Sequence, residues 1–402
     1  MYRLVASLFG LAWILLLIPG GETALAAMAL STAGLCLLFY GAQRHAHGLL
    51  LATTAVSSIG VAFSHHAGVL LLAWVVSGGS LTYVVRREGG ETSGKPGRVL
   101  ELQQHISSVL LLLALAGIVV VGQSWDLAAS PPVHRLWDRI MWLLAGAGVQ
   151  KSARIWDAVL TTLVASAAVF RLGVFPFPFS LRRSARRLHG IPLLILLAVF
   201  LPTSMCAVAR LSFGAETYGA ISLGSVATIL GAIALVTGAL LLQAEWLGES
   251  IIGLVAQCYV GLALLGIGSG ESMRTTMVVI QASIACGVGG LWTMRLRSLA
   301  QTSDLAKASG GYARHRELQL WHGVFVMAAC PWPGTPGGLI WMCVLGRSIA
   351  AGTGFGLVVL LGITLLYCGL FRSIGKVSVR LGLVGATPAP SPQRMEPQVE
   401  RT

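Results

Sequence analysis

The stretch Cys330-Pro331-Trp332-Pro333-Gly334-Thr335-Pro336-Gly337-Gly338 places three prolines and three glycines within eight residues, inside an apolar segment. Proline lacks a backbone N–H and its ring clashes with the preceding turn, so an α-helix that reaches this stretch is interrupted. In lipid such a break leaves backbone groups unpaired, and it survives only where protein or a water-filled cavity satisfies them. The stretch therefore predicts a broken helix at membrane depth.

A second interruption of the same kind lies about 155 residues earlier, in Phe170-Arg171-Leu172-Gly173-Val174-Phe175-Pro176-Phe177-Pro178-Phe179. Paired interruptions at corresponding places in two halves of a chain are typical of transporters built from inverted repeats. The alternative is that both are ordinary prolines at helix ends that face loops.

The composition excludes a soluble protein. Of the 402 residues, 55% are hydrophobic and only 11% are charged, with a mean hydropathy of +0.79, whereas soluble domains carry about 25% charged residues. A secreted disulfide scaffold, a nucleic-acid-binding domain and a Rossmann-type enzyme are excluded as well. The seven cysteines lie in apolar segments without a C-x-x-C pair, so we expect no metal or redox site. No P-loop, G-x-S-x-G, H-E-x-x-H or haem-ligand spacing occurs, and we expect no cofactor.

Twelve apolar stretches are long enough to cross the ~30 Å hydrocarbon core as helices. They lie at about residues 3–20, 23–40, 47–63, 66–85, 105–123, 155–174, 191–210, 218–242, 250–268, 274–296, 319–340 and 345–371. The sequence therefore predicts an all-α, polytopic membrane protein of about twelve transmembrane helices, with two inverted five-helix repeats that each contain a discontinuous helix. We expect two N-terminal transmembrane helices in 1–46, the repeats in 47–210 and 211–371, and a largely disordered cytoplasmic tail in 372–402.

The basic residues are placed unequally on the two sides of the expected bundle. With both termini in the cytoplasm, the short cytoplasmic segments hold nineteen Lys and Arg residues and the opposite side holds four. This asymmetry satisfies the positive-inside rule, so it accounts for the net charge of +13 without a nucleic-acid partner. The sequence predicts a multi-pass protein of the cell (inner) membrane.

Four motifs resemble those of a known family, the antiporter-like subunits of complex I and of Mrp cation/proton antiporters. The stretch 332–338 resembles the L-P-G-T-x-G-F motif at that family's broken twelfth helix, and 170–177 resembles its broken seventh helix. The stretch 63–74 is similar to the S-D-N…G-W-E approach to the fifth helix, and 253–261 is similar to the A-Y-S-S-I-x-H-x-G segment. The motifs occur in the family's order across about residues 47–371.

The chain departs from this family at its central charged positions. Val75 stands where the family has the fifth-helix glutamate, and Arg171 replaces the lysine of the broken seventh helix. Pro202 replaces the eighth-helix lysine, Trp341 the charged residue after L-P-G-T, and Pro178 the histidine of P-F-H. The chain therefore resembles a degenerate member that keeps one of four central charges.

Arg171 is the first candidate for a functional residue. A charged side chain at the bilayer centre costs about 2.5–3.5 kcal/mol even on mild scales, so its retention indicates a function. Arginine keeps its proton at physiological pH. Arg171 could therefore fix a water chain, hold an anion or pair with an acid from another subunit, but it cannot exchange protons. The alternative is that its side chain snorkels to the cytoplasmic surface.

The other candidates for an ion path are titratable residues and the helix breakers. They are Glu249, His65, His66 and His322, together with Pro176, Pro178, Pro333, Gly334 and Thr335. Histidines can exchange protons near neutral pH, and a carboxylate at a helix start also suits the helix dipole. Structural roles for Glu249 and the histidines therefore stay open.

The resemblance implies a membrane subunit of a proton- or ion-translocating complex, like the proton-channel subunits of NADH:quinone oxidoreductase. Any enzymatic role would be that of a non-redox membrane subunit, with other membrane subunits as partners in the bilayer. One alternative is the membrane half of a two-component bicarbonate-uptake system that works with a soluble zinc-bearing partner. The other is a degenerate, non-conducting scaffold subunit, which the missing acid and lysines favour. The sequence does not identify the transported ion.

Overall fold

The architecture comes from a computed structural model, which describes residues 45–64, 66–88, 94–122, 149–173, 180–188, 190–213, 223–268, 272–308, 312, 314–330 and 336–386. Several predictions lie outside these residues: the two N-terminal spans, the tail beyond residue 386, and His65, Pro176, Pro178, Pro333, Gly334 and Thr335. The described residues are mostly helical and form no β-strand; their β-pairing is limited to isolated bridges such as that between Leu247 and Asp304.

The first set of helices covers the first expected repeat. It consists of α3 (His45–Phe63), α4 (Ala67–Glu88), α5 (Gly94–Gly122), α7 (Val149–Leu172), the short α8 (Ser180–Arg187), and one continuous rod formed by α9 (Ile191–Leu194), the π-helix η2 (Ile195–Phe200) and α10 (Leu201–Phe213). In the rod, η2 marks the place where the backbone widens from the α-helical to the π-helical bonding pattern.

The second set of helices follows the first along the chain. It consists of α11 (Leu223–Ala244), α12 (Gly248–Gly268), α13 (Ser272–Ala300), α15 (Arg316–Ala329), α16 (Pro336–Ala351) and α17 (Thr353–Ala386). Successive helices contact one another in the same order in both sets: α3–α4–α5–α7 in the first and α11–α12–α13–α15 in the second.

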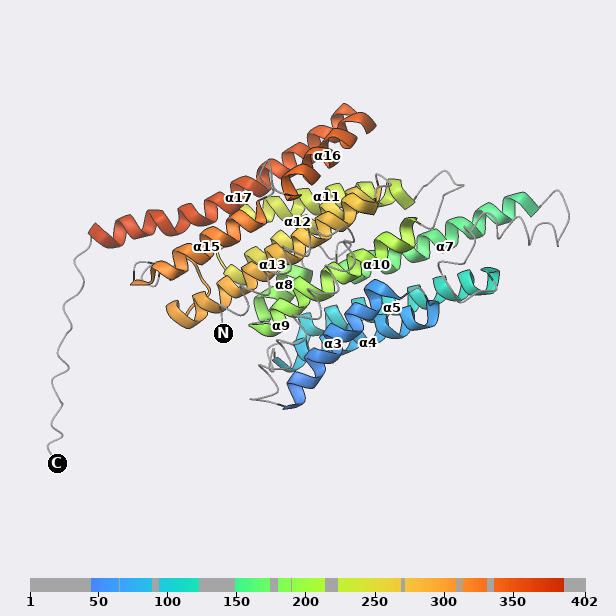
Figure 1. Cartoon of the computed structure of the whole chain (residues 1–402), viewed down its shortest axis with the longest axis horizontal. Helices are drawn as coiled ribbons and strands as arrows, with labels where there is room; N and C mark the ends of the chain where they lie inside the picture. The colour runs from blue at the N-terminus through green and yellow to red at the C-terminus, as the bar shows by residue number, and fades with distance from the viewer. Residues whose placement is uncertain are drawn as a thin grey trace.

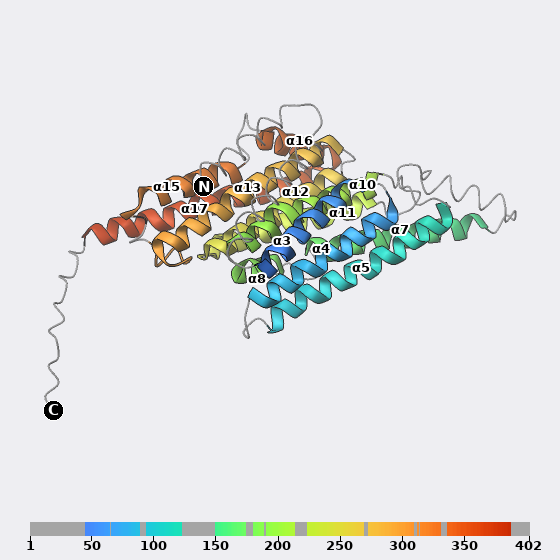
Figure 2. The ribbon, with the colours of Figure 1, turned by 60° about the horizontal axis from the view of Figure 1, so that its bottom comes forward.

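Seven helical segments of the described part are long and apolar enough to cross a membrane. They are Ala67–Arg87, Arg98–Val119, Ile191–Ala209, Gly224–Ala244, Gly248–Gly268, Thr275–Ala300 and Gly354–Val377. The helices run side by side along the long axis of the molecule, with α3, α4 and α5 at one edge and α16 and α17 at the other (Figures 1 and 2). The prediction of an all-helical protein with many apolar spans is confirmed in this part of the chain.

The last expected span was placed wrongly. The structure divides residues 319–371 among α15, α16 and α17, and the chain turns between α16 and α17 at Gly352. Because apolar residues continue on both sides of this turn, composition alone merged the end of α16 with α17 into one span, 345–371. Helix α17 also continues to Ala386, so residues 372–386 of the expected disordered tail are helical.

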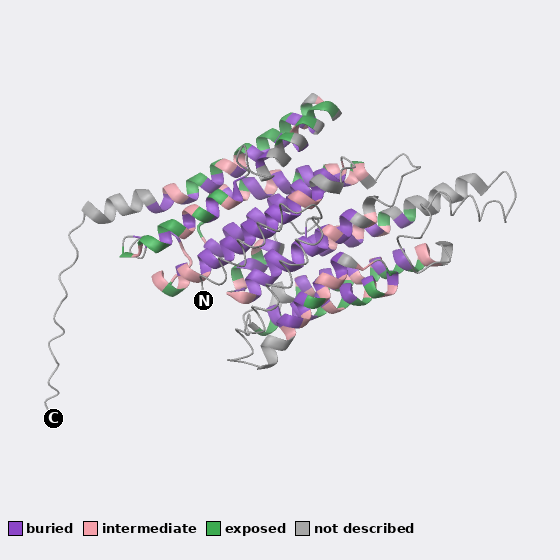
Figure 3. Ribbon diagram, viewed as in Figure 1, coloured by how far each residue is buried: buried purple, intermediate pink, exposed green. Residues whose placement is uncertain are grey.

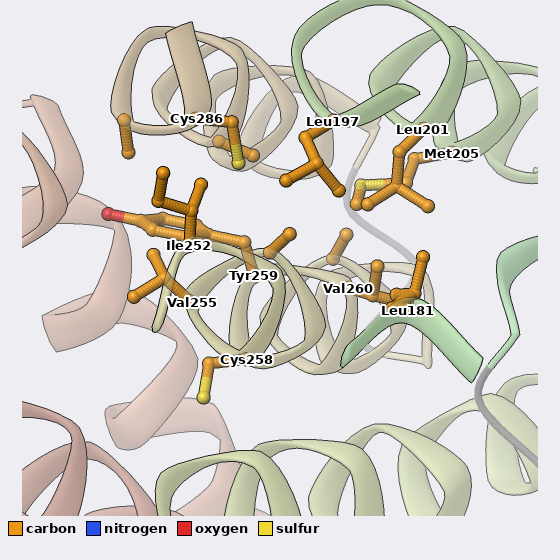
Figure 4. Close-up of a cluster of buried hydrophobic side chains, with 14 of the residues drawn as sticks. Leu181, Leu197, Leu201, Met205, Ile252, Val255, Cys258, Tyr259, Val260 and Cys286 are labelled. Atoms are coloured by element: carbon orange, nitrogen blue, oxygen red, sulfur yellow. The ribbon is translucent and has the colours of Figure 1, made fainter. Parts of the chain in front are cut away.

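The core lies where the two sets meet, around α12. Nearly every residue of α12 is buried, and the buried positions concentrate on α12, α13 and the α9–α10 rod (Figure 3). There Leu181 of α8 and Leu197 and Leu201 of the rod lie against Val260 and other side chains of α12 (Figure 4). This contact joins α8, the helix that follows the first break, to the second set of helices.

Candidate functional site

Arg171 lies in the last turn of α7, and only 2% of its residue surface is exposed. The side chain therefore does not snorkel to the surface, because neighbouring helices surround it. This burial also leaves it out of reach of an acid from another subunit. What holds the charge must come from this chain.

The guanidinium of Arg171 is bound by oxygen atoms from three neighbouring elements. Its Nε donates to Ser204 Oγ at 3.1 Å, and its Nη1 donates to the Trp74 carbonyl at 2.9 Å and to Gln104 Oε1 at 3.2 Å. Its Nη2 donates to Ser77 Oγ. We call these four oxygens the Arg171 cage. Within the described part of the chain, every group that bonds this guanidinium is neutral.

The two hydroxyl groups of the cage have their own protons directed elsewhere. Ser77 Oγ donates to the Trp74 carbonyl at 3.1 Å, and Ser204 Oγ donates to the Phe200 carbonyl at 2.7 Å. Each hydroxyl has one proton and two lone pairs, so its lone pairs are left for Arg171. The cage is thus built to accept hydrogen bonds.

Two aromatic rings lie against the guanidinium. The Cζ atom of Arg171 is 4.4 Å from the ring centre of Trp74 and 4.1 Å from that of Phe200, within the range of cation–π attraction. Trp74 is held in place because its Nε1 donates to Ser107 Oγ at 3.2 Å, and Ser107 Oγ donates to the Ala167 carbonyl at 2.7 Å. Helix α5 thereby fixes the ring of α4 beside α7.

The π-helix η2 and the start of α10 place Phe200 and Ser204 beside Arg171. Pro202 has no N–H for a carbonyl of the preceding turn. The Ala198 carbonyl in that turn accepts a bond from Ser283 Oγ of α13 at 2.5 Å. Phe200 ends η2 and Ser204 follows in α10. The proline thus leaves the Ala198 carbonyl to a donor from α13, and the same segment supplies a ring and a hydroxyl to Arg171.

The first helix break begins with a left-handed glycine. Gly173 has φ 65° and its N–H donates to the Phe170 carbonyl at 3.3 Å, the conformation that often ends a helix. Gln104 Nε2 donates to the Arg171 carbonyl at 3.5 Å. A glutamine of α5 therefore contacts both the main chain and the side chain of Arg171.

The second helix break is capped without charge. Helix α15 ends at Ala329, where Gln281 Nε2 of α13 donates to the Ala328 carbonyl at 2.6 Å and the Tyr259 hydroxyl of α12 donates to the Ala329 carbonyl at 3.0 Å. Buried side chains of neighbouring helices thus satisfy the two terminal carbonyls. Val75 of α4 is 46% exposed.

Glu249 and the histidines lie away from the Arg171 cage. Glu249 is in the first turn of α12 and accepts a bond from Arg297 Nε of α13 at 2.6 Å. His66 Nδ1 accepts the N–H of Gly68 at the start of α4, at 3.2 Å. Neither the Glu249–Arg297 pair nor the His66–Gly68 pair takes part in the hydrogen bonds of the cage. Both pairs form their hydrogen bond at the end of a helix.

His322 belongs to a separate buried network between α13, α15 and α17. Trp292 Nε1 donates to the Tyr312 hydroxyl at 3.0 Å, and that hydroxyl lies 3.3 Å from His322 Nδ1. His322 Nε2 lies 2.9 Å from Ser373 Oγ, which donates to the Leu370 carbonyl. Because each donor has one acceptor in this chain of bonds, the network is complete with a neutral imidazole protonated at Nε2.

Sequence reasoning missed Glu245, a carboxylate that is 3% exposed in the turn between α11 and α12. Arg182 Nε donates to it at 2.7 Å, and Arg186 Nη2 donates to both of its oxygens at 2.9 and 3.0 Å. Burial by itself raises the pKa of Glu245, but the hydrogen bond and charge of Arg182 and the charge of Arg186 bring it below its usual value of 4.5. The Lys376 ammonium bonds the main-chain carbonyl of Glu245.

Glu245, Arg182 and Arg186, here called the Glu245 cluster, fix α8 onto the second set of helices. Ala185 of α8 lies so close to α12 that a Cβ added at Gly253 would be 2.8 Å from the Cβ of Ala185. The run of arginines in residues 182–187 was the available signal, because bases at a bilayer edge often bind a buried acid nearby. Among the described residues, no group of three or more His, Cys, Asp or Glu side chains could hold a metal ion.

Comparison with known proteins identifies the fold. No protein-family model matches the chain, and no curated protein matches it. Solved structures do match: a chain of the membrane-bound sulfane sulfur reductase, an archaeal respiratory membrane complex, has a TM-score of 0.72 at 15% identity over 90% of this chain and 58% of that one. A chain of respiratory complex I from Thermus thermophilus has a TM-score of 0.66 at 16% identity, over 91% of this chain and 83% of that one.

The chain has a complex I-like membrane fold. It spans only 58% of the length of the sulfane sulfur reductase chain. The low identities limit the likeness to the fold.

Proposed function

We propose that the chain is a non-redox membrane subunit of an ion-translocating complex of the complex I type, integral to the cell membrane. The observation that carries this proposal is the buried charge of Arg171 at the end of a broken helix, within a fold shared with chains of two respiratory membrane complexes. A buried charge is expensive in a bilayer, and proteins keep one mainly where it acts on ions or protons.

The contribution of Arg171 in this proposal is electrostatic. Its charge is permanent, and the groups of the cage that bind it are dipoles without net charge. The positive field is therefore not cancelled locally, and it lowers the energy of negative charge and raises that of cations nearby. A fixed charge of this kind would bias proton transfer between titratable groups of neighbouring subunits without exchanging a proton itself.

Two features support the further proposal of inverted repeats. Both sets of helices have the same order of neighbours and each has its break after the fourth long helix. Such repeats place the two breaks near the middle of the membrane, where irregular backbone can line an ion path. The proposed partners are other membrane subunits.

A specific observation favours a second candidate function, a non-conducting scaffold. The cage contains no titratable side chain, and all four of its oxygens belong to this chain. A subunit with such a closed site could serve only to position its neighbours.

Proton flux in vesicles separates the two candidates. The complex is purified with its partners from membranes that carry Arg171→Ala, and substrate-driven proton uptake is measured after reconstitution. We expect flux to fall about tenfold, the loss that roughly 1.4 kcal/mol at a barrier produces, with the subunits still assembled. Arg183→Ala removes an exposed base of α8 and serves as the control. Unchanged flux with normal assembly supports the scaffold and rejects an active role for Arg171.

A further inference from the structure

The cage around Arg171 has the chemistry of a cation-binding site. Its four ligand atoms are one main-chain carbonyl, one amide oxygen and two hydroxyl oxygens, contributed by α4, α5 and α10. Rings of such neutral oxygens replace the hydration shell of monovalent cations in ion-conducting proteins. The usual partner of a buried arginine, a carboxylate, is not among the groups that bind it in the described residues.

The orientation of the hydroxyl groups makes this set of oxygens selective for positive charge. Ser77 and Ser204 each donate to a main-chain carbonyl of their own helix. Their lone pairs therefore stay directed at the centre of the cage whether or not a guanidinium is there. An anion at the same place would meet oxygen atoms and no free donor of these two residues.

The walls of the cage favour a flat, weakly hydrated cation. Trp74 and Phe200 lie against the guanidinium with their rings, and guanidinium combines a planar shape with weak hydration. The space itself depends on Gly78, because a Cβ there would lie 3.0 Å from Nη1 of Arg171 and 3.2 Å from Gln104 Oε1. Backbone, rings and oxygens together therefore surround the guanidinium closely.

We propose that these residues form a monovalent-cation site and that the chain fills it with its own side chain. Arg171 is then a tethered ion: it supplies the charge that the oxygens need and, being covalently held, it cannot leave. The site is closed to diffusing cations as long as the arginine is present. This inference goes beyond the proposed function, because it holds for a translocating subunit and for a scaffold alike.

Removing the tether tests the proposal directly. Arg171→Ala leaves the oxygens and the rings in place, so free guanidinium should bind where the side chain was. We expect guanidinium at millimolar concentration, present throughout purification in lipid nanodiscs, to recover at least half of the thermal midpoint that Arg171→Ala loses. The recovery should saturate with concentration. Urea, which has the same shape without the charge, should give none, and the wild-type midpoint should respond to neither compound.

Two results would overturn the proposal. One is a folded Arg171→Ala chain whose midpoint responds to guanidinium no more than the wild-type chain does. The other result is for the case that Arg171→Ala does not fold. In that case the stabilities of Arg171→Lys and Arg171→Met are compared, because the two side chains are similar in length and differ in charge. The proposal requires the lysine chain to fold and the methionine chain to be less stable. Equal behaviour of these two chains, folded or unfolded, rejects a cation site.

The outcome is independent of transport. Guanidinium-dependent stabilisation of Arg171→Ala with unchanged proton flux supports the cation site and rejects the proposed function. Loss of flux without any guanidinium effect rejects the cation site and leaves the proposed function standing.

Discussion

The two helix breaks differ in whether a charged side chain is buried beside them. At the first break the chain brings in a full positive charge, and Arg171 is held by four neutral oxygens and two aromatic rings. At the second break, Gln281 and Tyr259 donate to the last two carbonyls of α15. At both breaks a glutamine of a neighbouring helix donates to a terminal carbonyl, Gln104 to that of Arg171 and Gln281 to that of Ala328, as helix ends in lipid require. The difference shows that breaking a helix in this fold does not require a charge, so the charge of Arg171 needs a separate reason.

The helices that follow the two breaks, α8 and α16, also differ. Helix α8 has eight residues and packs against α12, with Arg182 and Arg186 bound to the buried Glu245. Helix α16 has sixteen residues and packs mainly against α17, its own neighbour in the sequence. The first break is thus held by charge on both sides and is tied to the other half of the molecule.

The largest effect is expected from removing the charge at the first break. Arg171→Met leaves four buried acceptors without their donor, each at about 1–3 kcal/mol, while it relieves the cost of a buried charge, about 2.5–3.5 kcal/mol. The difference of these two effects is a net loss of about 0.5–9.5 kcal/mol, with a midpoint of about 5 kcal/mol. Urea-induced or thermal unfolding in nanodiscs measures it. A methionine chain as stable as wild type would make the two breaks energetically equivalent.

Breaking the anchor of α8 is expected to have the next largest effect. Glu245→Gln removes the carboxylate that accepts bonds from two arginines, and hydrogen bonds to charged groups are worth about 1.5–3 kcal/mol. Glu317→Gln is the matched control, because Glu317 is 45% exposed and pairs with Arg295 at the surface at 3.2 Å. There we expect less than about 1 kcal/mol.

The pH dependence of this anchor has a definite sign. The pKa of Glu245 is lower in the folded protein than its usual 4.5, so the unfolded chain binds the proton more tightly. Its contribution to stability is complete above pH 4.5 and is lost as the pH falls below that value through the folded pKa. In thermal midpoints measured between neutral and acidic pH, the difference between wild type and Glu245→Gln should shrink on acidification. A difference that stays constant with pH would show that the carboxylate charge does not hold α8.

At the second break a smaller loss is expected. Gln281→Met removes the only side-chain donor recorded for the Ala328 carbonyl among the described residues, which leaves one buried acceptor unpaired at about 1–3 kcal/mol. Tyr259→Phe removes the hydroxyl that bonds Ala329 and should cost about 1 kcal/mol. Neither change should alter proton flux, because neither removes a charge. A larger loss than for Arg171→Met would reverse the ranking of the two breaks.

The sequence was sufficient for the breaks because their signal is local. Proline and glycine end helices through their own geometry: α7 ends at Leu172, inside the first predicted stretch, and α15 ends at Ala329, immediately before the second. Most helix positions followed in the same way from apolar length. The turn at Gly352 was missed because it lies in an apolar segment without a proline, and glycines alone are a weaker signal for a helix end.

The site could be predicted only in part, because its partners are distant in the chain. Arg171 stood out as a lone charge in an apolar segment, but its ligands are 33 to 97 positions away and are uncharged residues such as Ser77 and Gln104. Neutral polar residues inside helices have no distinctive spacing. Glu245 was missed for a related reason, since its arginine partners are 59 and 63 positions away.

The smallest and sharpest test of the first break uses two adjacent glycines of α4. A Cβ at Gly78 would be 3.0 Å from Nη1 of Arg171, whereas a Cβ at Gly79 would have nothing within 4 Å. Alanine in a helix is favoured over glycine by up to about 1 kcal/mol, so Gly79→Ala should raise the thermal midpoint slightly. Gly78→Ala gains the same propensity but pushes the guanidinium and Gln104 apart, and we expect it to lower the midpoint. Because the two variants add the same methyl group one residue apart, their difference reports the tightness of the Arg171 cage. Equal midpoints would mean that Arg171 can move away at no cost, and the contrast with the second break would then rest on charge alone.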